Sequence, residues 1–449
     1  MITRSKILST VLSLSLVAIS LSACIQKPVE EADTTKPWQG KEELELPESD
    51  TTLKARYDDL KNKASLAFTS TSVTDASAFE TEEIEGAISI VKYTGKDDIV
   101  VIPSEFSGKP VTSIAAGAFN GSAVTALYIP DSIDEIAKGA LEGAERLSTL
   151  RIPFIGDGKD NVYLGYIFNC DSYEKHPTGV PSGLDMVIVG SGNKVSENAF
   201  AGCKGISAII LPDSVTEIEG FAFYECSDLV YIDLGNAKSI GNYAMGLCTS
   251  LYSVDMSDAD SIGLGALYST NSLYSLSAKF IGGSEQDNRY IGYIFGAETA
   301  DFNDEYVSKS LRSVTLTDTE SIPDRAFASC GYITDISIPE GVKTIGTRAF
   351  YACRSLEKAD LPDSVISIGD DAFFACEKLV SIRLGSSLES IGMQAFFSCR
   401  SLDNVIIPDG VKTVGASAFA LCSSLKSVKI GTDTEIGKDA FLNCPYIQN

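Results

Sequence analysis

The chain has 449 residues, a formal net charge of −25 and an apolar content of 44%. This acidic balance argues against nucleic acid as a partner, because nothing in the chain could neutralise a run of phosphates. It also argues against simple electrostatic docking on anionic lipid. We attribute the charge first to solubility and self-repulsion.

Residues 1–23 have the layout of a secretory signal peptide. Two basic residues precede an apolar run over residues 7–21, which is too short to span a bilayer. The sequence Leu-Ser-Ala-Cys24 follows and resembles the lipobox of bacterial lipoproteins. That resemblance implies cleavage before Cys24, lipid attachment to its thiol and an extracytoplasmic, membrane-anchored location. The alternative is an ordinary cleavage site followed by an incidental cysteine.

Residues 24–82 are rich in acidic, hydroxyl and proline residues, which predicts a tether, because such a segment buries too little apolar surface to fold alone. Within it, residues 52–68 predict a short helix. The apolar side of this helix would carry Leu53, Tyr57, Leu60 and Leu66.

An N-terminal cap and a first coil are expected over residues 83–123. Residues 88–93 and 99–102 have the composition of strands joined by the turn at residues 94–96. A β-hairpin formed by these two runs would cover the exposed edge of the first coil.

Over residues 124–449 an Ala-Phe step, in places Ala-Leu or Ala-Met, recurs mostly every 22 or 23 residues. Between these steps runs Leu-x-x-Ile-x-Ile, often followed by Pro-Asp-x-Val-x-x-Ile. Such a period is typical of stacked coils that cannot bury their apolar face alone. The alternation favours a short strand, the Pro-Asp pair turns the chain, and Ala-Phe fills the interior. We therefore predict a right-handed, β-rich repeat solenoid of about 13 coils.

This consensus, completed by Gly-x-x-Ala-Phe-x-x-Cys, resembles the BspA-like class of bacterial surface leucine-rich repeats over about residues 85–449. The resemblance implies surface display and adhesion to extracellular or surface proteins. It carries no catalytic residues to transfer.

Two coils, at residues 147–183 and 273–310, are enlarged and share the sequence motif Tyr-x-Gly-Tyr-Ile-Phe. In one interpretation the enlarged segments project from the solenoid and set specificity. In the other, Gly-Tyr-Ile-Phe replaces Ala-Phe in the core and the remainder is a decorative loop. The candidate contact residues of these segments are Tyr163, Tyr166, His176, Tyr290 and Tyr293.

Nine cysteines follow the Ala-Phe step by three residues and should align one per coil. Ser122, Ala144 and Thr270 take their place where the series lapses, which indicates a need for small volume. We expect buried free thiols, with some disulfides as the alternative. The nine are Cys203, Cys226, Cys248, Cys330, Cys353, Cys376, Cys399, Cys422 and Cys444.

The sequence predicts no enzyme, cofactor or metal site. With a single histidine we expect neither a Ser-His-Asp triad nor a paired-histidine metal site, and no phosphate-binding or dinucleotide motif occurs. Carboxylate pairs for glycoside hydrolysis are not excluded by counting, but the acidic residues are scattered. Asp157, Asp160 and Asn161 form a small acidic group. We interpret this group as a turn rather than a calcium site.

The outward positions beside the central residue of each strand are the remaining binding candidate. Rows of hydroxyl, tyrosine and charged side chains there suit a protein partner or an extended glycan. Self-association through the C-terminal coil is a further expectation, because a bare last coil exposes strand edges. The candidate face residues are Tyr231, Asp233, Asp255, Asp335, Arg383 and Lys429.

Overall fold

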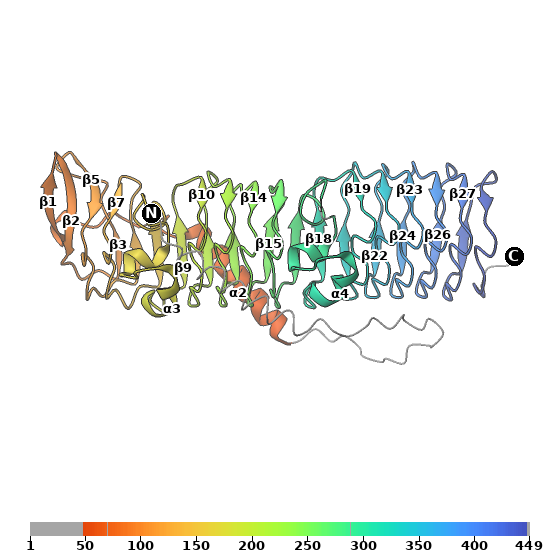
Figure 1. Cartoon of the computed structure of the whole chain (residues 1–449), viewed down its shortest axis with the longest axis horizontal. Helices are drawn as coiled ribbons and strands as arrows, with labels where there is room; N and C mark the ends of the chain where they lie inside the picture. The colour runs from red at the N-terminus through yellow and green to blue at the C-terminus, as the bar shows by residue number, and fades with distance from the viewer. Residues whose placement is uncertain (1–47, 70, 288, 447–449) are drawn as a thin grey trace, which may run out of the picture. The chain divides into compact units, whose positions relative to one another are not determined.

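The computed structural model describes residues 48–69, 71–287 and 289–446, which belong to one compact unit. These residues form a stack of coils in which short strands of successive coils lie side by side (Figure 1). The predicted leader, Cys24 and the first half of the tether lie outside the described residues.

One face of the stack is a parallel sheet of fourteen strands, each contributed by a successive coil. The repeat-solenoid prediction is therefore confirmed, with slightly more coils than the expected number of about 13. The strands are β3 (Ile99–Val101), β6 (Ala126–Tyr128), β8 (Thr149–Ile152), β9 (Met186–Val189), β11 (Ala208–Ile210), β13 (Tyr231–Asp233), β15 (Ser253–Met256), β17 (Ser275–Ala278), β18 (Ser313–Leu316), β20 (Asp335–Ser337), β22 (Lys358–Asp360), β24 (Ser381–Arg383), β26 (Asn404–Ile406) and β28 (Ser427–Lys429).

Across the core from this long sheet run two ladders of two-residue strands, where the Val-x-x-Ile pattern returns in extended form. The first comprises β10 (Lys194–Val195), β12 (Glu217–Ile218), β14 (Ser239–Ile240) and β16 (Ser261–Ile262). The second comprises β19 (Ser321–Ile322), β21 (Thr344–Ile345), β23 (Ser367–Ile368), β25 (Ser390–Ile391), β27 (Thr413–Val414) and β29 (Glu435–Ile436).

Each coil before the last buries one side of its strand and the Ala-Phe step or its replacement. In β22, Ala359 is buried between the exposed Lys358 and Asp360, as the period-2 geometry of a strand requires. The phenylalanine rings of successive coils stack in the interior with centroids 4.8–5.4 Å apart, so each ring contacts the one before and the one after. This phenylalanine spine includes Phe327, Phe350, Phe373, Phe396 and Phe419.

The N-terminal hairpin exists, but its strands differ from the predicted pair. β2 (Ala87–Tyr93) pairs antiparallel with β1 (Phe79–Ile84), which precedes it. The two-residue turn Glu85-Gly86 has positive φ at both positions, and such turns match the twist of a hairpin. The expected partner strand, β3, instead joins β6 in the long sheet. The cap is completed by β4 (Glu105–Phe106), β5 (Lys109–Ile114) and β7 (Glu135–Ile136).

Each enlarged segment is one widened coil, because β8 pairs directly with β9, and β17 with β18. Ile167 and Ile294 are buried and accept a backbone hydrogen bond from the Ala-Leu step of the preceding coil. Gly-Tyr-Ile-Phe thus replaces Ala-Phe in the core, as one of the two interpretations holds. The helical turns of these coils are η2 (Leu164–Phe168), η3 (Tyr173–Lys175), α3 (His176–Gly179), η4 (Ile291–Phe295), η5 (Ala300–Phe302) and α4 (Asn303–Tyr306).

Candidate interaction face

All six candidate face residues lie on the outward side of the long sheet. Tyr231 is half-buried and the other five are exposed, while the central residue between outward neighbours points into the core. Parallel pairing without offset brings outward residues of successive coils into rows, such as Asp360 beside Arg383. The six residues are spread over five strands, β13, β15, β20, β24 and β28.

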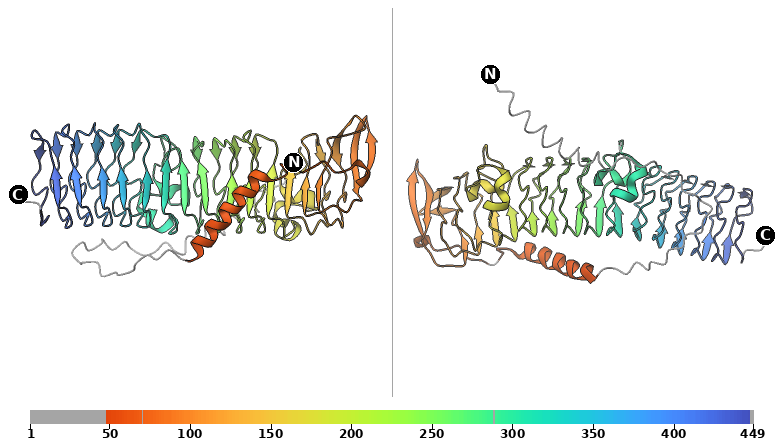
Figure 2. Two further views of the ribbon diagram at one scale, coloured as in Figure 1. Left: turned by 180° about the vertical axis from the view of Figure 1, so that it is seen from behind. Right: turned by 60° about the horizontal axis from the view of Figure 1, so that its bottom comes forward.

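Part of this face is covered by α2 (Glu48–Leu66), which crosses the strands obliquely (Figure 2). The predicted helix therefore exists, and its Leu60 is buried against the sheet. Leu53 and Tyr57 also pack there, whereas Leu66 is 68% exposed and takes no part. The segment after the helix, including η1 (Ala76–Ala78), leads into β1.

Polar and aromatic contacts fix the helix on the sheet. The Arg56 guanidinium donates to Ser207 Oγ at 2.5 Å and lies 3.9 Å from the Asp185 carboxylate. The Tyr57 ring meets the Tyr231 ring edge-to-face, with centroids 5.5 Å apart. Such a pair adds about 0.5–1.5 kcal/mol beyond the area it buries. Tyr231 is therefore a contact of the chain's own helix as well as a face residue.

Sequence reasoning missed this docking, although a signal was present. Outward positions of the long sheet are mostly polar, but beneath α2 these positions, and the residues directly before β13, β15 and β17, are apolar or tyrosine. Apolar residues on the outward side of a strand indicate that a second structural element packs on that side, opposite the core. We call this set the helix-docking stripe, and it consists of Met186, Ile188, Ala208, Ile210, Val230, Tyr231, Tyr252 and Tyr274.

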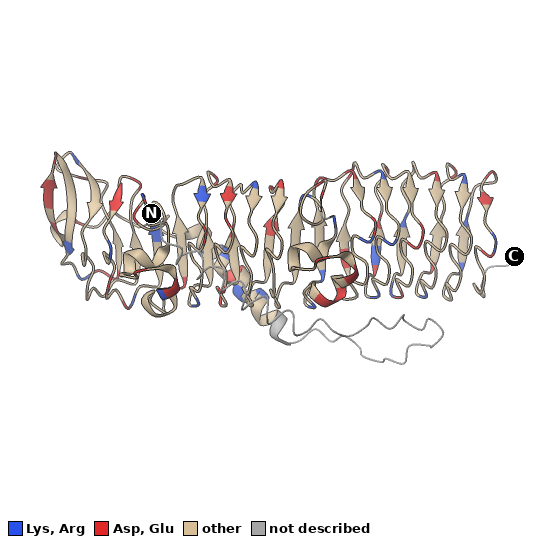
Figure 3. Ribbon diagram, in the orientation of Figure 1, with Lys and Arg blue, Asp and Glu red and all other residues tan. Residues whose placement is uncertain are grey.

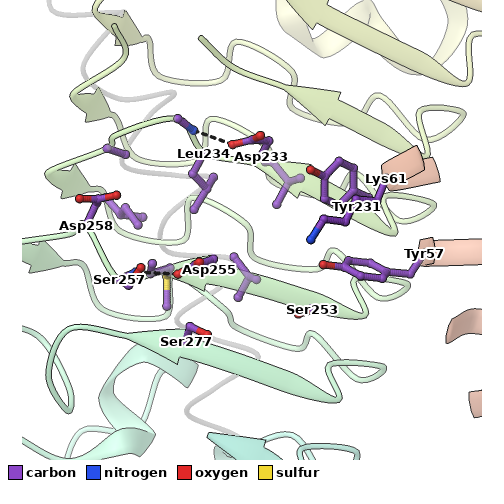
Figure 4. Close-up of a pocket in the computed structure, with 16 residues that line it drawn as sticks. Tyr57, Lys61, Tyr231, Asp233, Leu234, Ser253, Asp255, Ser257, Asp258 and Ser277 are labelled. Carbon is purple, nitrogen blue, oxygen red and sulfur yellow. Dashed lines mark hydrogen bonds between the residues drawn. The ribbon is translucent and has the colours of Figure 1, made fainter. Parts of the chain in front are cut away.

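Beside α2 lies a groove of about 400 Å³ whose floor is formed by β13 and β15 (Figure 4). Asp233 and Asp255 line it, and each carboxylate accepts a hydrogen bond from a backbone N–H two residues further on. Tyr57 and Lys61 enter it from α2. Burial, reinforced by the charge of Asp233, raises the pKa of Tyr231 to about 12, so its hydroxyl remains a hydrogen-bond donor.

Beyond α2 the long sheet presents paired charges of both signs (Figure 3). Arg383 lies 3.2 Å from the carboxylate of Asp363, and Lys358 pairs with Asp360 within its own strand. Exposed pairs of this kind contribute little to stability, typically ~0–1 kcal/mol. These pairs therefore contribute little to the stability of the fold.

The candidate tyrosines of the enlarged coils are half-buried and mainly close their own loops. The Tyr163 hydroxyl donates to the Cys170 carbonyl, and the Tyr290 hydroxyl makes the same bond to Ala297. Tyr166 and Tyr293 each pack edge-to-face on the tyrosine three residues earlier, with centroids 6.1 Å apart. The α3 and α4 segments lie on the side of the stack away from α2 (Figure 2).

His176, the remaining candidate, is only 1% exposed and does not face solvent. Its Nε2 accepts the backbone N–H of Gly165 at 2.9 Å, and its Nδ1 lies 2.7 Å from the Ala201 carbonyl oxygen. This geometry requires a neutral ring with its proton on Nδ1. Burial lowers the pKa of His176 to about 4. In the second enlarged coil Asn303 accepts the matching bond, from Gly292.

The cysteines of the described residues are free and buried. Seven of the nine thiols in the series donate to the phenylalanine carbonyl of the preceding coil, as Cys376 does to Phe350 at 3.2 Å; the exceptions are Cys203 and Cys330. Burial raises the pKa of Cys226 to about 12, so its thiol stays protonated. The position of the cysteine in each coil therefore favours a thiol both for its small volume and for its weak hydrogen-bond donor.

The acidic group at Asp157 forms a turn. Its carboxylate accepts hydrogen bonds from the backbone of Lys159 and from the backbone and side chain of Asn161. Although burial alone would raise the pKa of Asp157, these bonds lower it. Within residues 48–446 as described, no group of three acidic, histidine or cysteine side chains is placed to hold a metal ion. No described helix is both long and apolar enough to cross a bilayer.

Several solved structures resemble this chain. A leucine-rich repeat protein from Bacteroides ovatus is 21% identical, with a TM-score of 0.32, over 84% of this chain and 93% of its own. A leucine rich cell surface protein from Faecalibacterium prausnitzii is 22% identical, with a TM-score of 0.28, over 81% and 96%. The pneumococcal vaccine antigen PcpA is 18% identical, with a TM-score of 0.27, over 83% and 86%.

The repeats themselves match a described family. No curated protein matches the chain significantly. Residues 101–174, 185–281 and 320–448 match the BspA type leucine rich repeat region in six copies. Because this match covers more than half of the 449 residues, the chain belongs to the BspA-type leucine-rich-repeat family.

Proposed function

We propose that this chain is a lipid-anchored, extracytoplasmic protein that binds protein partners through the outward face of its long sheet and catalyses no reaction. The observation that carries the proposal is the sheet beyond α2, where exposed charged and polar side chains recur on successive strands. A rigid surface with both charge signs suits a folded partner, because complementary charge fixes register and raises the association rate.

Glycan capture is the alternative, and it calls for aromatic ring faces open to a sugar. Several of the described aromatic rings already contact other rings of the chain. Tyr57 and Tyr231 pack edge-to-face on each other, and Tyr351, Phe374 and Phe397 stack with centroids 4.9 Å apart. A surface whose rings already contact one another favours protein over sugar.

The proposal is tested by reversing charge on the face. We expect the double variant Arg383→Glu/Lys429→Glu to lose at least tenfold in affinity for matrix or surface proteins, because both side chains are exposed there. The matched control is Lys343→Glu, an exposed lysine outside the long sheet, which should bind like the wild type. Surface plasmon resonance against a panel of such proteins, with a glycan array in parallel, is the measurement. Binding to glycans alone would favour the alternative, and concentration-dependent self-association without either would favour an envelope role.

The anchoring part of the proposal rests on the lipobox resemblance at Cys24. We expect Cys24→Ala to move the protein from the membrane fraction to the soluble fraction, because one residue would carry the entire acyl anchor. Mass spectrometry of the wild type should find an acylated N-terminal cysteine. An unmodified Cys24 within a longer mature chain would contradict anchoring and leave the binding proposal intact.

A further inference from the structure

The helix-docking stripe is built as a surface separate from the solenoid core. Its fully buried members, among them Val230 and Ala208, form an apolar cluster with Leu60 that is distinct from the continuous core of the coils. The stripe runs obliquely: on β9 and β11 it uses the outward residues of the strands, and at β15 and β17 it uses Tyr252 and Tyr274, which precede them. An oblique apolar band on an otherwise polar sheet fits a helix crossing several strands.

The present occupant is held less firmly than the coils are. Among the described side chains of α2, Leu60 is the one that is buried completely, while Leu53, Tyr57 and Ala64 are partly covered. Most of the stability of a helix in a protein comes from the packing of its apolar face, and in α2 this face consists of few residues. Each inner coil, by contrast, packs against a neighbouring coil on both sides. Undocking of α2 therefore leaves the solenoid intact and belongs to the low-energy openings of the molecule.

We propose that the helix-docking stripe is a binding site for an amphipathic helix of a partner protein, and that α2 is its intramolecular occupant. The seated helix defines the chemistry of that partner. Its contact residues Leu53, Tyr57, Leu60 and Ala64 are alternately four and three positions apart in the sequence. This spacing places them along one apolar seam of the helix, which faces the sheet. The helix also carries a cation beside the seam, because Ser207 and Asp185 receive Arg56. A partner with this pattern competes with α2 for the stripe.

The test uses the full chain and a synthetic peptide with the sequence of residues 48–69. In the variant Leu60→Asp the charged side chain cannot enter the apolar cluster, so α2 undocks and the stripe opens. We expect the labelled peptide to bind this variant at least tenfold more tightly than the wild type in fluorescence anisotropy. Leu66→Asp is the matched control, because Leu66 is 68% exposed, and it should behave like the wild type.

A second variant locates the binding site. Val230 directly precedes β13 and is fully buried beneath α2. We expect Leu60→Asp/Val230→Asp to lose peptide binding while its solenoid melts as in the single variant. Leu60→Ala, a milder change, should bind the peptide with intermediate affinity.

Two results would overturn the inference: a folded Leu60→Asp protein that does not bind the peptide, or equal binding to the wild type and to the variant. The peptide comes from this chain, so either result is independent of whether the sheet beyond α2 binds proteins.

Discussion

Replacing Phe373 by alanine is expected to cost about 3–5 kcal/mol of stability, among the largest losses for any single substitution in this fold. Its ring is fully buried and stacks between those of Phe350 and Phe396, at 4.8 and 5.1 Å. The cavity would interrupt the phenylalanine spine, so both adjoining coils lose contacts. Urea unfolding followed by circular dichroism should show the loss, and hydrogen exchange should place it near residues 344–400.

The neighbouring Phe374 supplies the control. It stacks on Tyr351 and Phe397 at 4.9 Å, but it is only half-buried. We expect Phe374→Ala to cost only about 1–2 kcal/mol. Equal losses at the two positions would mean that ring stacking, rather than burial in the spine, dominates the stability of a coil.

The second large effect concerns pH and His176. Its pKa is about 4 in the folded protein, against 6.5 when it is exposed. Between these values the unfolded chain binds the proton and the folded protein does not, so lowering the pH favours unfolding. The contribution of neutral, buried His176 to the free energy of unfolding is fully present above about pH 6.5. It falls by about 3 kcal/mol by pH 4.

The duplicated coil shows how to isolate this contribution. Asn303 occupies the corresponding place, accepting from Gly292 N–H and donating to the Arg325 carbonyl at 3.2 Å. We expect His176→Asn to stay within about 1–2 kcal/mol of the wild type at pH 7 and to lose the His-dependent part of the acid sensitivity. Thermal melts of both proteins from pH 7 to pH 4 measure the difference, in which the titration of shared carboxylates cancels. Parallel stability curves would show that His176 is not the group responsible.

Much of the interior could be predicted because it repeats. The Ala-Phe step and the nine cysteines of the series recur mostly every 22 or 23 residues, and all of them except Phe441 are buried in the structure. Features that occur once were harder. The run 99–102 had the composition of a hairpin strand, and only its contacts with β6 show that it belongs to the long sheet. Composition cannot distinguish these pairings, because both place the same residues in a strand.

The candidate face was predicted in part. Its outward positions follow from the period of a strand, and all six residues are placed on that side. The docking of α2 was missed because it depends on residues more than 100 positions away, such as Ser207 for Arg56. The burial of His176 was missed for a similar reason, since its partner Ala201 lies in the next coil.

The route of the chain through α2 has a mechanical consequence. The helix crosses the sheet from the region of Tyr274, so α2 begins over the middle of the coil stack and not beside its first coil (Figure 2). Tension applied through the polypeptide before Glu48 reaches the helix contacts before any coil. Undocking α2 would then free the chain from Glu48 up to β1. The point at which the force acts on the solenoid would move to its N-terminal end. Under tension the contacts of α2 with the sheet would therefore break first, while the coils stay stacked.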